Sequence, residues 1–392
     1  MSTNDPKDMQ TAVLDRYKQG AREVEPALCC PITNYDRKYL DILPQEILDK
    51  DYGCGDPSQY VNPGDTVIDL GSDAGKICYI LSQMVGEQGK VIGVDFNDEM
   101  LDLARKYQDD IAKQIGYHNT HFVKARIQDM ALDLDRVQSW LQKHPINNVD
   151  DVMAYEVYCD QLRRDEPLIA ANTVDAIVSN CVLNLVDANL KAQLFKDMFR
   201  VLKNGGRAVI SDIVCDETPS TEMINDPDLW SGCISGAFRE DLFLKMFLDA
   251  GFHGVEILSR AQDPWHTING IEFRSMTVRA YKGKEGPCLD RNQAVVYKGP
   301  WSQVKDDDGH TLFRGQRMAV CEKTFNLYTN PTGPYAQDIV GIEPHTTIPL
   351  DDATPFNCRA NATRSVREQK GEDYTPTIAH ESESCCEGGD CC

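Results

Sequence analysis

From Asp65 onward, short runs of β-branched and aliphatic residues alternate with longer stretches in which apolar residues recur every three or four positions. The short runs predict buried strands and the longer stretches predict amphipathic helices, an alternation typical of βαβ units around a mostly parallel sheet. The expected strands are 66–70, 90–95, 121–124, 174–179, 207–212, 255–259 and 273–280. The expected helices are 76–85, 98–106, 188–201 and 240–250.

Local signals refine these boundaries. Asp98 stands where a helix N-cap is expected, and Asn204-Gly205-Gly206 predicts a helix end followed by a turn. The stretch 130–172 is long for a connection between two strands, and its Asp-rich, partly helical pattern predicts a surface insertion.

The pattern changes after Lys282, where Gly and Pro punctuate apolar runs that are too short for long helices. We expect a small mixed or β-rich domain at 286–358, after an N-terminal region at 1–60 and an α/β domain at 61–282. The segment 361–392 is polar and poor in bulky apolar residues, so we expect it to be disordered.

The composition narrows the function classes for this chain of 392 residues. Its formal charge of −22 disfavours a nucleic acid or an anionic membrane as partner, because phosphates would be repelled. The N-terminus lacks the apolar core of a secretory signal, and no apolar run is long enough to span a bilayer, so we expect a cytoplasmic protein. We therefore expect the 15 cysteines to be in a reducing compartment, where thiols more often bind soft metals or do redox chemistry than form structural disulfides.

The segment VIDLGSDAGKICYIL joins a buried strand to a helix through Gly71 and Gly75, and the next strand ends at Asp95. Small residues let a nucleotide approach the backbone, and a carboxylate at the next strand end can accept both ribose hydroxyls. Two other interpretations of this loop are open. It could be a tight turn with a purely structural role, or it could bind the cofactor of a dinucleotide dehydrogenase, although such an enzyme would show a fuller G-x-G-x-x-G. The loop is similar to the shorter methyltransferase form D-x-G-x-G-x-G, except that Asp73 replaces the middle glycine.

Three cysteine contexts stand near the expected ligand edge of the sheet: DYGCGD at Cys54, SNCVLNL at Cys181 and WSGCISGA at Cys233. The plain alternative for each is a buried, inert thiol. The glycines beside two of them would permit close approach of a bulky bound atom. Two vicinal pairs in the tail either chelate a metal or belong to a tolerated disordered segment: Cys385, Cys386, Cys391 and Cys392.

The chain resembles the arsenite S-adenosylmethionine methyltransferases from about Met9 through Arg279, with weaker likeness beyond. The segments that carry the resemblance are the three cysteine contexts at Cys54, Cys181 and Cys233, together with VLKNGG and IDLGSDAGKICYILSQMVGEQGKVIGVD. The resemblance implies a Rossmann-like class I methyltransferase domain with a mostly parallel seven-stranded sheet, and a smaller mixed α+β or β-rich C-terminal domain. It also implies that Cys54, Cys181 and Cys233 bind trivalent arsenic, with a fourth reactive thiol at Cys29 or Cys30.

The same resemblance assigns the cofactor residues. They are Asp69, Gly71, Ser72, Gly75 and Asp95 for the methionine and ribose parts, Met100, Ile127 and Gln128 for the adenine end, and Ser179 and Asn180 for the methionyl group.

Trivalent arsenic is soft and prefers thiolate sulfur, and its lone pair can attack the sulfonium methyl carbon without a general base. Attack oxidises arsenic, so we expect thiols, reset by glutathione or thioredoxin, to return electrons. We expect a monomer that makes methylated arsenicals. The alternatives are a methyltransferase for an organic small molecule such as a quinone or sterol, and a thiol-rich buffer of soft metal ions.

Overall fold

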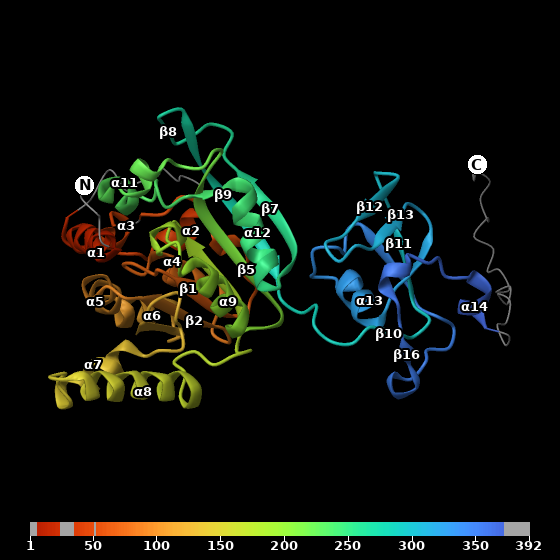
Figure 1. Ribbon diagram of the computed structural model, residues 1–392, viewed down its shortest axis with the longest axis horizontal. Coiled ribbons are helices and arrows are strands. Elements are labelled where there is room, and N and C mark those ends of the chain that lie inside the picture. Colours follow the sequence, from red (N-terminus) through yellow and green to blue (C-terminus); the bar gives the residue numbers. More distant parts are fainter. Residues whose placement is uncertain (1–5, 24–34, 51, 372–392) are drawn as a thin grey trace. The chain divides into compact units, whose positions relative to one another are not determined.

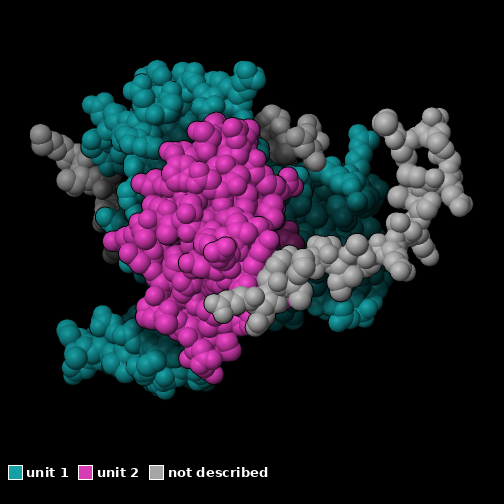
Figure 2. All heavy atoms as spheres, turned by 90° about the vertical axis from the view of Figure 1, so that its right-hand side faces the viewer, with its two compact units in different colours: residues 1–283 teal, residues 284–392 magenta. Residues whose placement is uncertain are grey.

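The computed structural model describes residues 6–23, 35–50 and 52–371. The chain divides into two compact units, residues 1–283 and 284–392 (Figure 2). Within the described ranges, no helix combines the length and the apolar character needed to cross a membrane.

The first unit is built on one central sheet (Figure 1). Its main path runs β3-β2-β1-β4-β5-β9-β7, with β6 beside β5 and β8 beside β9. The strands from β3 to β5 are parallel, whereas β9 is antiparallel to both β5 and β7. The bounds are β1 Thr66–Leu70, β2 Lys90–Asp95, β3 Thr120–Lys124, β4 Val174–Asn180, β5 Leu202–Cys215, β6 Phe238–Arg239, β7 His253–Arg260, β8 His266–Ile268 and β9 Ile271–Tyr281.

Helices cover both faces of this sheet. One apolar core packs α9 and α12 against the sheet, and a second core packs α2, α3, α4, α5 and α6 against it. The bounds are α1 Pro6–Arg22, α2 Arg37–Leu40, α3 Gln45–Leu48, α4 Lys76–Val85, α5 Asp98–Lys106, α6 Gln108–Ile115, α9 Lys191–Val201, α10 Thr221–Ile224, α11 Pro227–Ser231 and α12 Glu240–Ala250, with short 3₁₀ turns η2 Pro57–Tyr60 and η3 Leu183–Leu185. The predicted Rossmann-like class I fold is confirmed.

Two local predictions are wrong in detail. Asn97, not Asp98, is the N-cap of α5, because its side chain accepts a hydrogen bond from the Glu99 backbone N–H. The turn at 204–206 lies within the bounds of β5 rather than before it, because Leu202 already pairs with Val174 while residues 203–206 loop out before Arg207 pairs with Ala176.

The predicted insertion contains two helices, α7 Leu134–Lys143 and α8 Val149–Asp165, which lie at one end of the unit (Figure 1). These helices have a small apolar core of their own, made by Leu132, Val137, Cys159 and Leu162. The insertion therefore adds to the surface without interrupting the sheet.

The second unit is mixed and rich in short strands, as expected. One core holds β11, β13, β14, β15 and α13 together. The bounds are β10 Leu289–Asp290, β11 Ala294–Tyr297, β12 Gln303–Lys305, β13 Thr311–Phe313, β14 Arg317–Ala319, α13 Glu322–Thr329, β15 Ile339–Ile342, η4 Leu350–Asp352, β16 Thr354–Pro355, η5 Cys358–Ala360 and α14 Val366–Lys370.

The expected disorder from residue 361 is wrong for residues 361–371. The Ala319 backbone N–H donates to the Ala362 carbonyl, Arg364 pairs with Asp290, and Gln369 is only 3% exposed. Hydrogen bonding, rather than bulky apolar residues, orders this segment, and composition does not reveal it. The rest of the tail, 372–392, lies outside the described residues.

Candidate active site

The loop after β1 carries three residues in the left-handed backbone region. Gly71, Asp73 and Gly75 have φ of 69°, 44° and 86°. Asp73 thus adopts the conformation of the glycine that it replaces, which Asp tolerates better than most residues. A Cβ on Gly71 would lie 2.4 Å from the Val182 side chain, so glycine is required where this loop meets the loop after β4.

Asp95 at the end of β2 is held in a fixed orientation. Its Oδ2 accepts the Asp73 backbone N–H at 3.0 Å, and its Oδ1 accepts the Asn97 backbone N–H at 2.9 Å. Burial raises the pKa of this carboxyl, while the backbone donors oppose that shift. Each oxygen can accept a further hydrogen bond, as a nucleoside diol would require.

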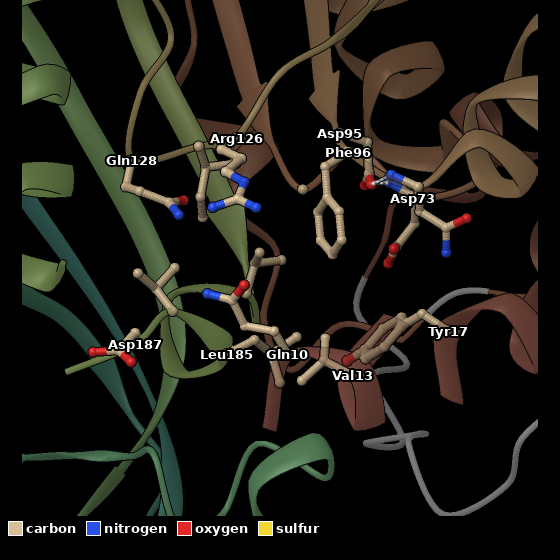
Figure 3. Close-up of a pocket in the computed structure, with 15 residues that line it drawn as sticks. Gln10, Val13, Tyr17, Asp73, Asp95, Phe96, Arg126, Gln128, Leu185 and Asp187 are labelled. Carbon is tan, nitrogen blue, oxygen red and sulfur yellow. Dashed lines mark hydrogen bonds between the residues drawn. The ribbon is translucent and has the colours of Figure 1, made fainter. Parts of the chain in front are cut away.

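A cleft opens beside this carboxylate. Figure 3 shows Asp95, Phe96, Arg126 and Gln128 on one side of the cleft, with Gln10, Val13 and Tyr17 of α1 on the other.

The structure brings together most of the residues predicted to bind the cofactor. Gly71, Asp95, Ile127 and Gln128 line the cleft. Asp69, Ser72 and Asn180 line a smaller pocket that shares Gly71 and Asp73 with it. The remaining three predicted residues line neither pocket: Gly75, Met100 and Ser179.

The reasons for these three placements differ. Gly75 caps the N-terminus of α4, behind the loop. Met100 is fully buried in a core formed with α1 and α11. The Ser179 hydroxyl donates to the Leu70 carbonyl at 3.0 Å, so it ties β4 to β1.

Sequence reasoning missed Phe96 and the contribution of α1. Phe96 follows Asp95 directly and is 40% exposed although it is aromatic, which suits a ring that stacks on a planar ligand. Position alone could have revealed it, because it is the first residue beyond the strand end. The apolar spacing of Val13 and Tyr17 predicts a helix face but not what that face covers.

The predicted thiols lie next to residues that line the cleft. Cys181 immediately follows β4 and precedes Val182, which lines the cleft. Cys54 and Cys181 form a disulfide with 5.7 Å between their Cα atoms. The Cys233 thiol donates to the Cys181 carbonyl at 3.2 Å, and the hydroxyl of Tyr17 lies 3.8 Å from its Sγ. Cys54 and Cys181 belong to one buried apolar cluster, which Cys233 joins through its hydrogen bond to the Cys181 carbonyl, and each of the three is at most 5% exposed.

Two of these cysteines have a backbone conformation that is unfavourable for their residue type. Cys181 has φ of 63° and Cys233 has φ of 61°. A residue with a Cβ pays roughly 1 kcal/mol or more to occupy this region. Such positions concentrate at functional sites, and here they belong to two of the three cysteines expected to bind arsenic.

Asn180 fixes the loop that carries Cys54. Its Oδ1 accepts the backbone N–H groups of Cys54 and Gly55 at 2.8 and 2.9 Å, and its Nδ2 donates to the Gly55 carbonyl at 2.8 Å. A Cβ on Gly53 would lie 2.0 Å from Nδ2 of Asn180, and one on Gly55 would lie 2.5 Å from Oγ of Ser211. These glycines therefore allow the chain to pack on the sheet end, and the approach of a bound atom stays a prediction.

Asp212 completes the cluster and was not predicted as a site residue. One of its carboxylate oxygens and the Sγ atoms of Cys54 and Cys181 all lie within 4.8 Å of one another. Burial raises the pKa of Asp212 to about 7, although the N–H groups of Ile213 and Leu183 and the charge of Lys191 favour its ionised form. Burial also lowers the pKa of Lys191 to about 8.

The remaining predicted thiols cannot be placed. Cys29 and Cys30, and the four tail cysteines, lie outside the described residues.

Comparison with known proteins agrees with this geometry. A family described as a methyltransferase domain matches residues 61–165 and 158–251, and a family described as a domain of unknown function matches residues 284–374. The arsenite methyltransferase of Aquipseudomonas alcaligenes is 28% identical over 327 residues, which are 79% of this chain and 83% of that protein. The arsenite methyltransferase of Homo sapiens is 26% identical over 353 residues, 85% of this chain and 83% of that protein.

The crystal structure of an arsenic(III) S-adenosylmethionine methyltransferase from Chlamydomonas reinhardtii has a similar fold. It is 24% identical, has a TM-score of 0.53, and covers 85% of this chain and 99% of its own.

Proposed function

This chain belongs to the arsenite methyltransferase family, and we propose that it transfers methyl groups from S-adenosylmethionine to trivalent arsenic held by Cys54, Cys181 and Cys233. The observation that carries the residue assignment is the position of Cys181, which directly adjoins a residue lining the cleft while its sulfur is bonded to Cys54.

The residues of the cleft fit S-adenosylmethionine. Asp95 offers acceptors for the ribose hydroxyls, Phe96 offers a ring for the adenine, and Asp69 lies in the adjoining pocket for the amino-acid end. When bound, the cofactor supplies a methyl group on a positively charged sulfur, which is the electrophile of the reaction.

The thiol cluster must be reduced before arsenic enters. Cys54 and Cys181 then become thiols, and Cys233 turns from its hydrogen bond with the Cys181 carbonyl. Asp212, whose pKa is raised to about 7 by burial, is placed to accept a proton from a neighbouring thiol near neutral pH. Arsenic bound to three sulfurs carries no proton and keeps its lone pair, so no base is required for attack on carbon.

The Cys54–Cys181 disulfide gives the thiols a second role. Methyl transfer formally oxidises arsenic to the pentavalent state, and two thiolates can return two electrons to it by forming one disulfide. Asn180 holds Cys54 against Cys181 for this step. A thiol reductant such as glutathione or thioredoxin would then restore the pair, which implies a reducing, cytoplasmic setting.

The two alternatives account for less of the molecule. A methyltransferase for a quinone or sterol leaves the strained backbone at Cys181 and Cys233 without a purpose. A thiol-rich buffer gives no role to the cleft beside Asp95.

The direct test supplies the protein with methyl-labelled S-adenosylmethionine, arsenite and a reductant, followed by chromatography of the arsenic species. Labelled methylated arsenicals are expected only when arsenite is present. Label that appears solely on an added quinone or sterol, or no labelled product at all, would overturn the proposal.

A further inference from the structure

The second unit contains a three-cysteine cluster of its own. The Sγ atoms of Cys288, Cys321 and Cys358 all lie within 4.8 Å of one another, and none of these cysteines is in a disulfide. They stand 33 and 37 positions apart in the sequence, so the fold, rather than local spacing, brings them together.

Two short strands place the first and last of these thiols. β10 and β16 pair antiparallel, with Leu289 opposite Pro355. The Phe356 backbone N–H donates to the Cys288 carbonyl at 2.8 Å, which continues this pairing to the cysteine itself. Cys358 follows two residues later, at the start of η5. The strand pair therefore carries one thiol on each strand end.

The N-terminus of α13 supplies the third thiol. Cys321 is the N-cap of this helix, and its Sγ lies 3.5 Å from the Thr324 backbone nitrogen and 3.2 Å from the Thr324 hydroxyl oxygen. Such donors, and the positive end of the helix dipole, stabilise a thiolate. An ion pair of 2.5 Å between Arg291 and Glu322 fixes the helix start beside the end of β10.

These thiols form a ligand set rather than an inert core. Cys321 is buried, while Cys288 and Cys358 are partly exposed, so an ion can reach the cluster from solvent. Within the described residues, the group consists of three sulfurs, with no histidine or carboxylate among its members. We propose that Cys288, Cys321 and Cys358 form a second binding site for trivalent arsenic, in the domain of unknown function.

The binding reaction involves no redox change. Three S–H bonds and three As–OH bonds of arsenous acid break, three As–S bonds form, and three water molecules leave. No oxidant or reductant is consumed, and arsenic remains trivalent.

Ligand number favours arsenic over zinc as the occupant. Structural zinc sites are closed by four ligands, whereas three sulfurs satisfy pyramidal trivalent arsenic, which keeps its lone pair. The choice of arsenic rests on the proposed function, but the three-thiol site itself does not. Zinc is therefore the competitor that the experiment must exclude.

The first experiment measures arsenic binding in the full-length chain without the other thiols assigned to it. The background variant carries Cys→Ser at positions 29, 30, 54, 181 and 233 and at the four tail cysteines, and is kept reduced by a phosphine. After arsenite loading and gel filtration, about one arsenic per chain should remain, with three sulfur neighbours in its X-ray absorption spectrum.

Adding Cys358→Ser or Cys321→Ser to this background should remove most of the retained arsenic, whereas adding Cys159→Ser, a buried thiol of the insertion, should not. Retention that does not depend on Cys321 and Cys358 would overturn the proposal. So would a tightly bound zinc ion that excludes arsenite from these sulfurs.

A second measurement avoids any folding defect of these variants. In the reduced wild-type protein, arsenite should protect Cys288, Cys321 and Cys358 together from alkylation, as read by mass spectrometry of the peptides. Alkylation of the three at unchanged rates would contradict the site. Neither readout involves methyl transfer, so failure of the proposed enzymatic function leaves this test intact.

Discussion

Within the described residues, two groups of cysteines lie in different surroundings. The first cluster comprises Cys54, Cys181 and Cys233. A carboxylate oxygen of Asp212 lies close to the sulfurs of Cys54 and Cys181, and Cys233 donates to the Cys181 carbonyl. Two residues that adjoin these cysteines, Val182 and Tyr17, line the cleft. The cluster of the second unit lies on a short strand pair and a helix N-terminus, and its members are three thiols alone.

From this difference we expect that thiols alone do not make a methyl-transfer site. Four features distinguish the first cluster. A cleft that would hold the methyl donor lies beside it, and Cys181 and Cys233 have a strained backbone. The side chain of Asn180 holds Cys54, and the carboxyl of Asp212 is buried. Each of these features can be removed separately.

Cys181→Ser should have the largest effect, because it removes a sulfur ligand and one half of the disulfide. We expect the rate of arsenite methylation to fall at least about 100-fold, since displacement of a reacting atom by even 1 Å has an effect of that order. The rate is measured from labelled methylarsenicals, with Cys159→Ser as the matched buried control. A Cys181→Ser variant that keeps more than a tenth of the rate would remove the distinction between the clusters.

Asn180→Ala should release the Cys54 loop. The backbone N–H groups of Cys54 and Gly55 would lose their acceptor, which we expect to lower the free energy of unfolding by about 2 kcal/mol. Urea denaturation measures this change, and the alkylation rate of reduced Cys54 reports whether the loop has become mobile.

Asn180→Asp is the conservative partner, because a carboxylate still accepts both N–H groups although it cannot donate to the Gly55 carbonyl. It should restore most of the protection of Cys54. Equal alkylation rates in all three proteins would show that Asn180 does not position the thiol.

Asp212→Asn should change how stability depends on pH. The folded pKa of Asp212, about 7, lies above that of an unfolded Asp, near 4, so the folded state holds this proton more tightly. Its contribution to stability is fully present below pH 4 and is lost as pH rises to 7. The unfolding free energy of the wild type should therefore fall, relative to that of the variant, by on the order of 1 kcal/mol or more across this window.

Denaturant midpoints at pH 4, 5, 6 and 7 provide the measurement. A constant difference between the two proteins would mean that Asp212 titrates normally and is not held protonated by burial.

Phe96→Ala should weaken S-adenosylmethionine binding by about 3–10-fold, the loss expected for one aromatic stacking contact. Arsenite binding to the reduced protein should not change, because Phe96 lies at the cleft and not among the sulfurs. Calorimetric titration with each ligand separates the two effects. Weaker binding of both ligands would indicate a general folding defect.

The fold was accessible from the sequence because its signals are local. The bounds of β1, α4, β2, α5 and α12 agree with the predicted ranges, since apolar periodicity and strong turn residues mark both ends of each element. Gly71 and Asp95 were accessible for the same reason, because a strand–glycine–helix pattern places them at one edge of the sheet.

The features that could not be predicted from the sequence depend on contacts between segments that are distant in the chain. The role of Asn180 requires knowing that Cys54, 126 positions away, donates its N–H to it. The pKa of Asp212 depends on burial, which the letter D in a strand does not reveal. The second thiol cluster likewise arises from the pairing of β10 with β16, two strands too short to give a periodic signal.

The most direct test of the central claim is a single turnover on arsenic bound at the first cluster. The protein would carry Cys→Ser at positions 288, 321 and 358 and at the four tail cysteines, be reduced, loaded with arsenite, and mixed with methyl-labelled S-adenosylmethionine in a rapid-quench experiment. We predict that the label moves onto the bound arsenic, and that no transfer occurs when Cys181→Ser is added. Unchanged transfer in that variant, or no transfer in its parent, would contradict the assignment of Cys54, Cys181 and Cys233 as the site of methylation.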